Sequence, residues 1–338
     1  MTNVPDPPSR STFLARYGYV VVAAPPILIL SAALLLFDVS ANVTMEDFAR
    51  LLHSLAQHTQ ALSPARTLAE VRALYIWLFS VVLNMSVDVG ALVLCGLMIY
   101  RFHSRRRLLL MVVMVAVLCL GGVLMLFQSI AAKGALYQSV FAFTYVMLES
   151  SARFSPTFLT YVHSFLFVIN GLAVVVPAVV LLTACSTLAP PEDDRSPDID
   201  FLADQMRSLK EILAIGSAVL FTGILHMDNW LRWPAALVGD ETVQEAVLGM
   251  ALAVSLFWGA TFTLLLFATY TPAAGILSRR ARELLKRDAS QQNIPNSEEW
   301  LKEHGFFIGV KEELPQIAAI AAPFLAGPLE SLLTAALR

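Results

Sequence analysis

Charge and cysteine are both scarce in this chain of 338 residues. Charged residues make up 14% of the sequence, whereas hydrophobic residues make up 57%. The three cysteines, Cys95, Cys119 and Cys185, have no metal-ligand spacing and lie within long apolar runs. Their placement favours a role as small packing residues over disulfide bonding or metal binding. So little charge excludes a soluble fold for a chain whose apolar runs are long enough to span a membrane.

Motifs of enzymes and of selective channels are missing too. The sequence has no G-x-x-x-x-G-K-[ST] phosphate loop, no H-E-x-x-H, no G-x-S-x-G with a suitable histidine and no pair of Asp-rich motifs. It has no helix with an arginine at every third position, which excludes voltage sensing, and no TVGYG-like filter. Because no nucleophile–base pair can be identified, an enzyme is not the favoured class. The sequence identifies no cofactor and no metal site.

Six long apolar runs are what the sequence does contain. Each is as long as, or longer than, the ~20 residues that a helix needs to cross a hydrocarbon core. We therefore predict an all-α, polytopic helical membrane protein with about six transmembrane helices. The runs cover residues 17–37, 73–100, 108–130, 160–188, 212–237 and 247–277.

Basic residues between these runs predict the orientation. If the N-terminus is cytoplasmic, the inner segments carry fourteen Lys and Arg residues near the helix ends and the outer loops carry five. Cytoplasmic loops of membrane proteins are enriched in these residues. We therefore expect a multi-pass plasma (inner) membrane protein with both termini in the cytoplasm.

The chain divides into five parts on this prediction. Residues 1–16 form a disordered cytoplasmic N-terminus, and 17–188 form a first membrane block of three to four helices with two outer loops. An acidic cytoplasmic linker, 189–211, precedes the last two transmembrane helices in 212–277. Residues 278–338 are expected to form a cytoplasmic helical tail.

Two outer loops and the tail carry apolar residues, which we expect to be shielded from water by the membrane or by other protein. An amphipathic stretch at 45–62 is expected at the membrane surface, and 135–148 has the length of an interfacial helix or, less favoured, a re-entrant segment. The tail is apolar but interrupted by prolines, so it is expected to dock under the bundle or against another subunit. Besides the lipid bilayer, we predict a homo-oligomer or a membrane partner through 131–159 and 315–338, and no nucleic acid.

Asp88 is the most informative polar residue in the predicted spans. It lies about 18 Å from the inner interface, near the midplane, where an ionised carboxylate costs roughly 3 kcal/mol or more. It belongs to a small and polar stripe with helical spacing, which packs inward or lines a cavity. Two interpretations stay open: a protonatable or cation-coordinating carboxylate, or a protonated aspartate that hydrogen-bonds a neighbouring helix. The stripe consists of Ser80, Asn84, Asp88, Ala91 and Cys95.

A second polar cluster, HMDNWLRWP, ends the fifth predicted span. His226 and Asn229 share a helix face with Thr222, and His226 is predicted within a few ångströms of the depth of Asp88. Its role is either that of a hydrogen-bonded structural histidine or that of a proton relay with Asp88. Asp228 points elsewhere, and its i+4 spacing predicts a structural ion pair with Arg232. The tryptophans that follow, at 230 and 233, are expected to mark the outer headgroup region.

Asn170 adds a polar side chain in the fourth predicted span, roughly level with Asn84. Three helices would then line a water-accessible vestibule with Asp88 at its floor, unless these residues serve packing alone. The leading hypothesis is a channel or an ion- or proton-coupled transporter with an intramembrane carboxylate. The alternative is a non-conducting membrane scaffold that acts through its outer loop and its cytoplasmic tail.

Overall fold

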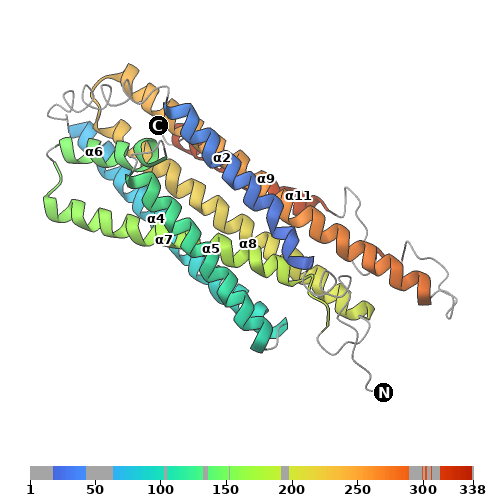
Figure 1. Ribbon diagram of the computed structural model, residues 1–338. Helices are drawn as coiled ribbons and strands as arrows, with labels where there is room; N and C mark the ends of the chain where they lie inside the picture. Colours follow the sequence, from blue (N-terminus) through green and yellow to red (C-terminus); the bar gives the residue numbers. More distant parts are fainter. Residues whose placement is uncertain are drawn as a thin grey trace.

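The computed structural model consists of long helices laid side by side (Figure 1). In the part of the chain that it describes there are helices and no strands, which confirms the all-α prediction. The described residues are 18–42, 64–102, 105–131, 136–151, 153–191, 198–288, 299, 301–302, 306 and 313–336. The predicted N-terminal segment 1–16 and the amphipathic stretch 45–62 lie outside them.

Eleven helical elements of the described chain form the bundle. They are η1 (Gly18–Ala23), α2 (Ala24–Asn42), α4 (Pro64–Phe102), α5 (Arg105–Ala131), the π-helical turn η2 (Tyr137–Ala142), α6 (Phe143–Ser150), α7 (Pro156–Ser186), α8 (Ile199–Arg232), η3 (Trp233–Leu237), α9 (Glu241–Asp288) and, counted with them as the last long helix, α11 (Leu314–Ala336).

Five of these helices are long and apolar enough to cross a membrane. They contain five of the six predicted runs, in the stretches Val21–Val39, Thr67–Tyr100, Pro156–Ser186, Ile199–Leu237 and Glu241–Lys286. The remaining run, 108–130, forms α5, but the apolar stretch described within it, Leu108–Leu124, is shorter than a full span.

Side-chain caps explain where three of the helices begin. The Asp198 carboxylate accepts a hydrogen bond from the Phe201 N–H at 2.8 Å, and Ser155 Oγ accepts one from the Phe158 N–H at 3.2 Å, with Pro156 in the first turn of α7. Asp240 does the same for α9 through the Val243 N–H. Because α8 begins at Ile199, the second half of the predicted linker 189–211 is helical and continues directly into the following span.

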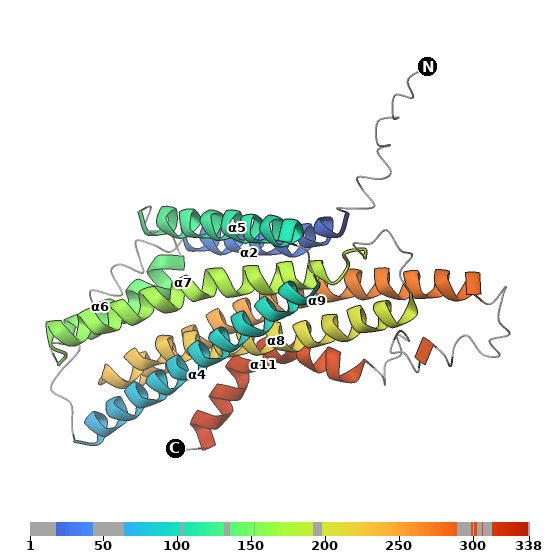
Figure 2. The ribbon, with the colours of Figure 1, turned by 90° about the horizontal axis from the view of Figure 1, so that it is seen from below.

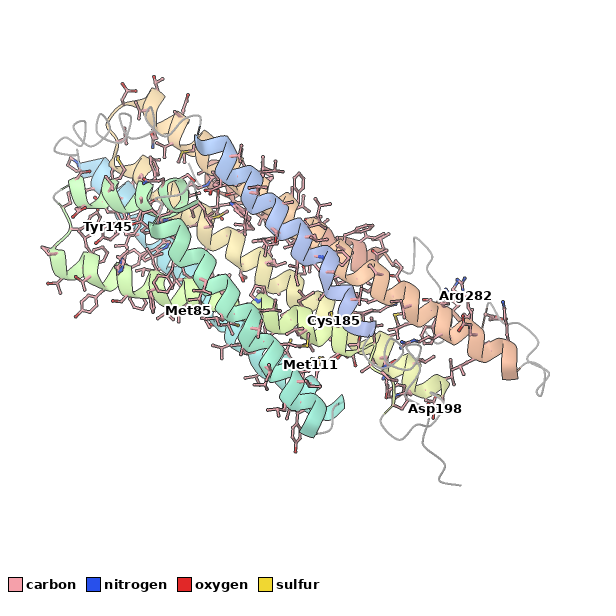
Figure 3. All side chains as sticks on the ribbon, in the orientation of Figure 1. Met85, Met111, Tyr145, Cys185, Asp198 and Arg282 are labelled. Atoms are coloured by element: carbon pink, nitrogen blue, oxygen red, sulfur yellow. The ribbon has the colours of Figure 1, made fainter. Side chains whose placement is uncertain are left out.

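The helices are arranged in layers. In Figure 2, α2 and α5 lie on one side, α4, α8 and α11 lie on the other, and α7 and α9 run between them. Helix α8 is central, since it contacts α4, α7, α9 and α11, whereas α5 packs on α7 and α2 packs on α9. The bundle has two ends: we call the one that carries α6 the α6 end, and the one where α7 connects to α8 the linker end. Tyr145 lies at the first and Asp198 and Arg282 lie at the second (Figure 3).

Helix α4 is polar inside and apolar outside. The stripe from Ser80 to Cys95 is buried, whereas Val82, Val89 and Leu97 on the opposite face are more than half exposed. This inverted pattern is typical of a multi-pass membrane helix, whose polar groups turn into the bundle and whose apolar side chains face lipid.

The apolar second loop packs on the α6 end of the bundle. Phe143 and Met147 of α6 are buried, Trp230 Nε1 of α8 donates to the Val140 carbonyl at 2.8 Å, and the Thr144 hydroxyl donates to the Trp230 carbonyl at 2.9 Å. The helix expected within 135–148 is therefore present. Its apolar side chains are covered by the chain itself, and the predicted contact of 131–159 with a partner stays a prediction.

Helix α11 differs most from expectation, because it runs along the bundle instead of under it. At the linker end Glu313 pairs with Lys210 at 3.3 Å and accepts a hydrogen bond from the Tyr270 hydroxyl at 2.7 Å. Further along, Ser217 Oγ of α8 donates to the Ala319 carbonyl at 2.6 Å. At the far end Arg232 of α8 donates to Ser331 Oγ at 2.6 Å. Helix α11 thus follows α8 for most of its length.

Two glycines allow this close packing of α11. A Cβ atom added at Gly259 of α9 would lie 2.7 Å from the Pro323 carbonyl oxygen, and one added at Gly327 of α11 would lie 3.0 Å from Ser255 Cβ. Helix α11 holds Pro323 and Pro328 without ending, which helices buried against neighbours tolerate. The interruptions that argued against a membrane-depth helix are therefore accommodated by packing.

Candidate intramembrane polar site

Asp88 lies inside the bundle, on the face of α4 that contacts α8. It is 2% exposed, and its stripe neighbours Ser80 and Asn84 are buried with it. The exposed valines of α4 cover the opposite face. The carboxylate is thus shielded from lipid, as an intramembrane aspartate must be.

Asn84 joins Asp88 to the neighbouring helix. Its Nδ2 donates to Asp88 Oδ2 at 3.1 Å, and its Oδ1 accepts a hydrogen bond from Thr222 Oγ1 of α8 at 3.1 Å. Gly223 of α8 lies beside this contact, and a Cβ there would meet Asn84 Oδ1 at 3.8 Å, an ordinary van der Waals distance. A single amide therefore connects the carboxylate of α4 with the hydroxyl of α8.

The register between α4 and α8 places Asp88 and His226 at different depths. Helices α4 and α8 run in opposite directions, and Asn84 is level with Thr222 because their side chains are hydrogen-bonded. Asp88 lies one turn from this level toward the linker end and His226 lies one turn toward the α6 end. At 1.5 Å per residue the two are about 12 Å apart along the bundle. The prediction that they share one depth is wrong, and a direct proton exchange between them is excluded by this separation.

His226 instead contacts an aromatic cluster at the α6 end. Its ring centroid is 6.3 Å from that of Trp77, which in turn lies 5.5 Å from Trp230 and 5.2 Å from Trp233. All three tryptophans are buried. The tryptophans at 230 and 233 therefore do not point outward but fill the interior between α4, α8 and η3; that they mark the depth of the outer headgroups stays a prediction. We call Trp77, Trp230, Trp233 and His226 the tryptophan cluster.

The two predicted asparagines have different surroundings. Asn229 lies beside the tryptophan cluster, 8% exposed, and its Nδ2 donates to the Leu225 carbonyl of its own helix at 2.9 Å. Asn170 of α7 is half-buried, and among the described residues no hydrogen bond links it to Asn84, Asp88 or Thr222. The polar row therefore follows the interface between α4 and α8 and does not extend to α7 through hydrogen bonds.

Asp228 belongs to a separate network, in which both of its carboxylate oxygens have a partner. It is 0% exposed; one carboxylate oxygen pairs with Arg232 and the other accepts a hydrogen bond from Ser255 Oγ of α9 at 2.7 Å. Arg232 continues to Ser331 of α11. This network ties three helices together and neutralises the buried aspartate.

Metal binding finds no support in the geometry. Within the described segments, no group of three or more His, Cys, Asp or Glu side chains lies close enough to hold a metal ion. The groups at this site are hydrogen-bonding side chains and one carboxyl group that can gain or lose a proton.

Comparison with known proteins adds no family. No protein-family model, curated protein or solved structure matches this chain. Its function must therefore be argued from the site alone.

Sequence reasoning missed three residues of these networks. Ser255 lies in an apolar segment with no neighbouring polar residue, and Ser331 follows Glu330 in an apolar tail whose partner helix the sequence does not reveal. Trp77 lies near the outer end of the second predicted run, where a tryptophan indicates the membrane interface and not the interior. The signal that could have found it is its spacing, three residues before Ser80 on the buried face of α4.

Proposed function

We propose that this protein carries protons, or small cations in their place, across a membrane, and that Asp88 is the group that binds them. One observation supports the proposal above all: Asp88 is a buried carboxylate that has an amide neighbour and, among the described residues, no basic partner. Asp228, at a similar degree of burial, has the Arg232 guanidinium. Arg232 therefore neutralises Asp228 permanently. Asp88 has no such partner, so its charge is neutralised by a bound proton or cation.

The physical reason is the cost of charge in a membrane. An ionised aspartate at the midplane of the membrane costs roughly 3 kcal/mol or more of insertion free energy, so an aspartate without a basic partner is neutral in the resting state. Asn84 can hydrogen-bond either form of the carboxyl group, because its amide offers both a donor and an acceptor. A carboxyl group that is neutral at rest and keeps a hydrogen bond when it is ionised is suited to the binding and release of a proton.

Topology completes the proposal. We infer that the protein lies in the plasma membrane with its linker end in the cytoplasm, because the basic residues of the sequence gather at that end. Helix α11 would then cross the membrane as well: the 18 residues from Glu313 to Ser331 rise about 27 Å, close to the ~30 Å of a hydrocarbon core. The last turn of α11 would lie on the outer side, which replaces the expectation that both termini are cytoplasmic.

Flux measurements in liposomes test the proposal. Purified protein is reconstituted with a pH-sensitive dye inside the vesicles, and a pH gradient with a matching K⁺/valinomycin potential drives proton entry. We expect proton flux with the wild type and at least a tenfold lower flux with Asp88→Asn, since an amide cannot take up a proton at neutral pH. Parallel assays with Na⁺ and K⁺ gradients decide between protons and metal cations.

Ser86→Ala is the matched control. Ser86 lies two residues from Asp88 on the exposed side of α4 and bonds only its own helix, at the Val82 carbonyl. This variant should retain wild-type flux. If Asp88→Asn folds normally and conducts like the wild type, or if neither protein conducts any ion, the transport proposal fails and the non-conducting scaffold becomes the better explanation.

A further inference from the structure

The Thr222 hydroxyl lies where α8 meets the Asp88 site. It donates a hydrogen bond to Asn84 Oδ1 at 3.1 Å, and the other end of the same amide, Nδ2, donates to Asp88 Oδ2 at 3.1 Å. All three side chains are buried between α4 and α8. The hydroxyl is therefore joined to the carboxylate through the amide.

The orientation of the Asn84 amide decides which form of Asp88 it stabilises. An amide has a donor at its nitrogen and an acceptor at its oxygen, whereas an ionised carboxylate only accepts hydrogen bonds. With Nδ2 toward Asp88, the amide stabilises the ionised form. With the amide turned over, Oδ1 would face the carboxyl group and could accept a hydrogen bond only from the protonated form.

Thr222 holds the amide in the first of these orientations. Its hydroxyl oxygen also lies 2.9 Å from the Ala218 carbonyl and 3.2 Å from the Val219 carbonyl, but a hydroxyl has a single proton to donate. Those two carbonyls lie inside α8 and accept backbone N–H groups of that helix. Asn84 Oδ1 has no other donor within the described segments. Because a buried acceptor without a donor is costly, the hydroxyl proton is directed to Asn84.

The elements that pack on α4 bring few other titratable groups to this site. The main ones are α8, α7 and η3. Helix α7 contains no Asp, Glu, Lys or Arg, and η3 contains no titratable residue. The titratable residues of α7 lie toward its two ends: Tyr161, His163 and Cys185. On the face of α8 that carries Thr222 the titratable residue is His226, about 12 Å from Asp88 along the bundle, and α4 itself adds the buried thiol of Cys95. In the described part of the chain, the side chain that donates to Asp88 is that of Asn84.

We propose that Thr222 is a positioning residue of the Asp88 site: it fixes the Asn84 amide with its N–H toward the carboxylate and so favours release of the proton. The positioning stands on the hydrogen-bond geometry; its part in transport rests on the proposed function. In the release the Asp88 O–H bond breaks, the electron pair stays on the carboxylate and the proton passes finally to bulk water.

Infrared titration tests the positioning role without an assay of transport. The purified protein is titrated in detergent, and the C=O stretching band of protonated Asp88 is identified by its absence in Asp88→Asn. Thr222→Val keeps the shape of the side chain and removes the hydroxyl. It should raise the midpoint of this band by about one pH unit, the equivalent of one lost hydrogen bond. Thr222→Ser keeps the hydroxyl and should titrate close to the wild type. An unchanged or lower midpoint with Thr222→Val would overturn the proposal.

Two further variants separate positioning from a general effect on the bundle. Ser217→Ala removes another hydroxyl of α8, one that donates to the Ala319 carbonyl on a different side of the helix, and should leave the midpoint unchanged. Asn84→Leu removes the amide through which Thr222 acts, so adding Thr222→Val to Asn84→Leu should cause no further shift. A further shift in this double variant would contradict a role through Asn84. Thr222→Ala, with the same expected shift, replaces the valine variant if that variant does not fold.

Flux measurements connect the positioning role with transport. Under a K⁺/valinomycin potential at equal pH on both sides, the pH of half-maximal proton flux should rise with Thr222→Val by the same amount as the infrared midpoint. If flux depends on Asp88 but the infrared midpoint does not move with Thr222→Val, this inference fails and the proposed function stands. If the midpoint moves but none of the proteins conducts protons, the positioning role stands and the proposed function fails.

Discussion

Asp88 and Asp228 show how one residue type serves two purposes in the same bundle. Both are buried, but Asp228 has a guanidinium and a hydroxyl as partners, whereas Asp88 has an amide. In the first arrangement a cation balances the charge of the Asp228 carboxylate, and the hydrogen bond from Ser255 joins α8 to α9. The second leaves the charge state of the carboxyl group open to change, which is the basis of the transport proposal.

Replacement of Arg232 should be among the most destabilising changes at the scale of a single residue. Arg232→Met would leave the Asp228 carboxylate buried without a cation, which typically costs 3–5 kcal/mol of unfolding free energy. Asp228→Asn combined with Arg232→Met should recover most of this loss, because the Asp228 charge is then removed together with its cation. Reversible unfolding in detergent micelles measures both.

Arg279→Met provides the comparison for that experiment. Arg279 pairs with Glu283 at 2.9 Å on the exposed part of α9, where both side chains are more than half exposed. Exposed pairs contribute about 0–1 kcal/mol, so this variant should unfold almost like the wild type. An Arg232→Met variant that is no less stable than Arg279→Met would contradict the structural role assigned to the buried pair.

At the scale of helices, glycine decides how closely α9 and α11 approach. Gly259 faces the backbone of α11, with the Pro323 carbonyl oxygen 2.7 Å and Phe324 Cα 3.0 Å from the position of an added Cβ atom. Backbone atoms in a packed helix cannot rotate away. Even a methyl group at this position must therefore push the two helices apart.

Gly259→Ala should lower the melting temperature and separate α11 from α9. Separation is measured as a loss of disulfide formation between Ser217→Cys and Ala319→Cys, residues whose wild-type atoms are hydrogen-bonded. Gly249→Ala and Gly275→Ala on the same helix meet nothing within 4 Å and should leave both readouts unchanged. Comparable cross-linking in all three variants would show that α11 does not depend on this contact.

Helix α5 offers a milder version of the same test. A Cβ atom at Gly122 would lie 2.6 Å from Val174 Cγ1 of α7, but this contact is a side-chain methyl group that can move. Gly122→Ala should therefore cost less stability than Gly259→Ala, and Gly121→Ala, which meets nothing within 4 Å, should cost least. Thermal unfolding of the three variants in one detergent gives this order directly.

At the scale of the whole molecule, the two ends of the bundle differ in what they hold. Helix α11 begins beside Lys210 at the linker end and finishes beside Arg232, toward the α6 end (Figure 1). Seven helices of the described chain therefore run between the two ends: α2, α4, α5, α7, α8, α9 and α11. If all seven cross the membrane, an odd number places the start of the first and the end of the last at opposite sides, as the proposed topology requires.

Cysteine accessibility tests this topology. In a background with the three native cysteines replaced by alanine, Arg338→Cys should react with a membrane-impermeant maleimide on intact cells. Ser196→Cys, in the connection between α7 and α8, should react only after the membrane is permeabilised. If neither site reacts on intact cells, α11 does not cross the membrane, and the C-terminal tail is cytoplasmic as the sequence predicts.

Local patterns in the sequence determined much of this structure. The apolar runs predict six helices, because backbone polar groups in lipid must be hydrogen-bonded within a helix, and five of the described helices are long and apolar enough to cross a membrane. The spacing of Ser80, Asn84 and Asp88 predicts which face of α4 turns inward, since helical periodicity alone assigns residues to a face. It does not say which helix that face meets.

Contacts between helices decided the rest. The register of α4 against α8 separates Asp88 from His226 by about 12 Å, a quantity that depends on two distant segments and on neither alone. The place of α11 depends on Gly259 and on the pairing of Arg232 with Ser331, 99 residues apart in the chain. Periodicity shows which face of a helix is buried. The partner of that face, its depth and its register are determined by the packing of side chains that are far apart in the sequence.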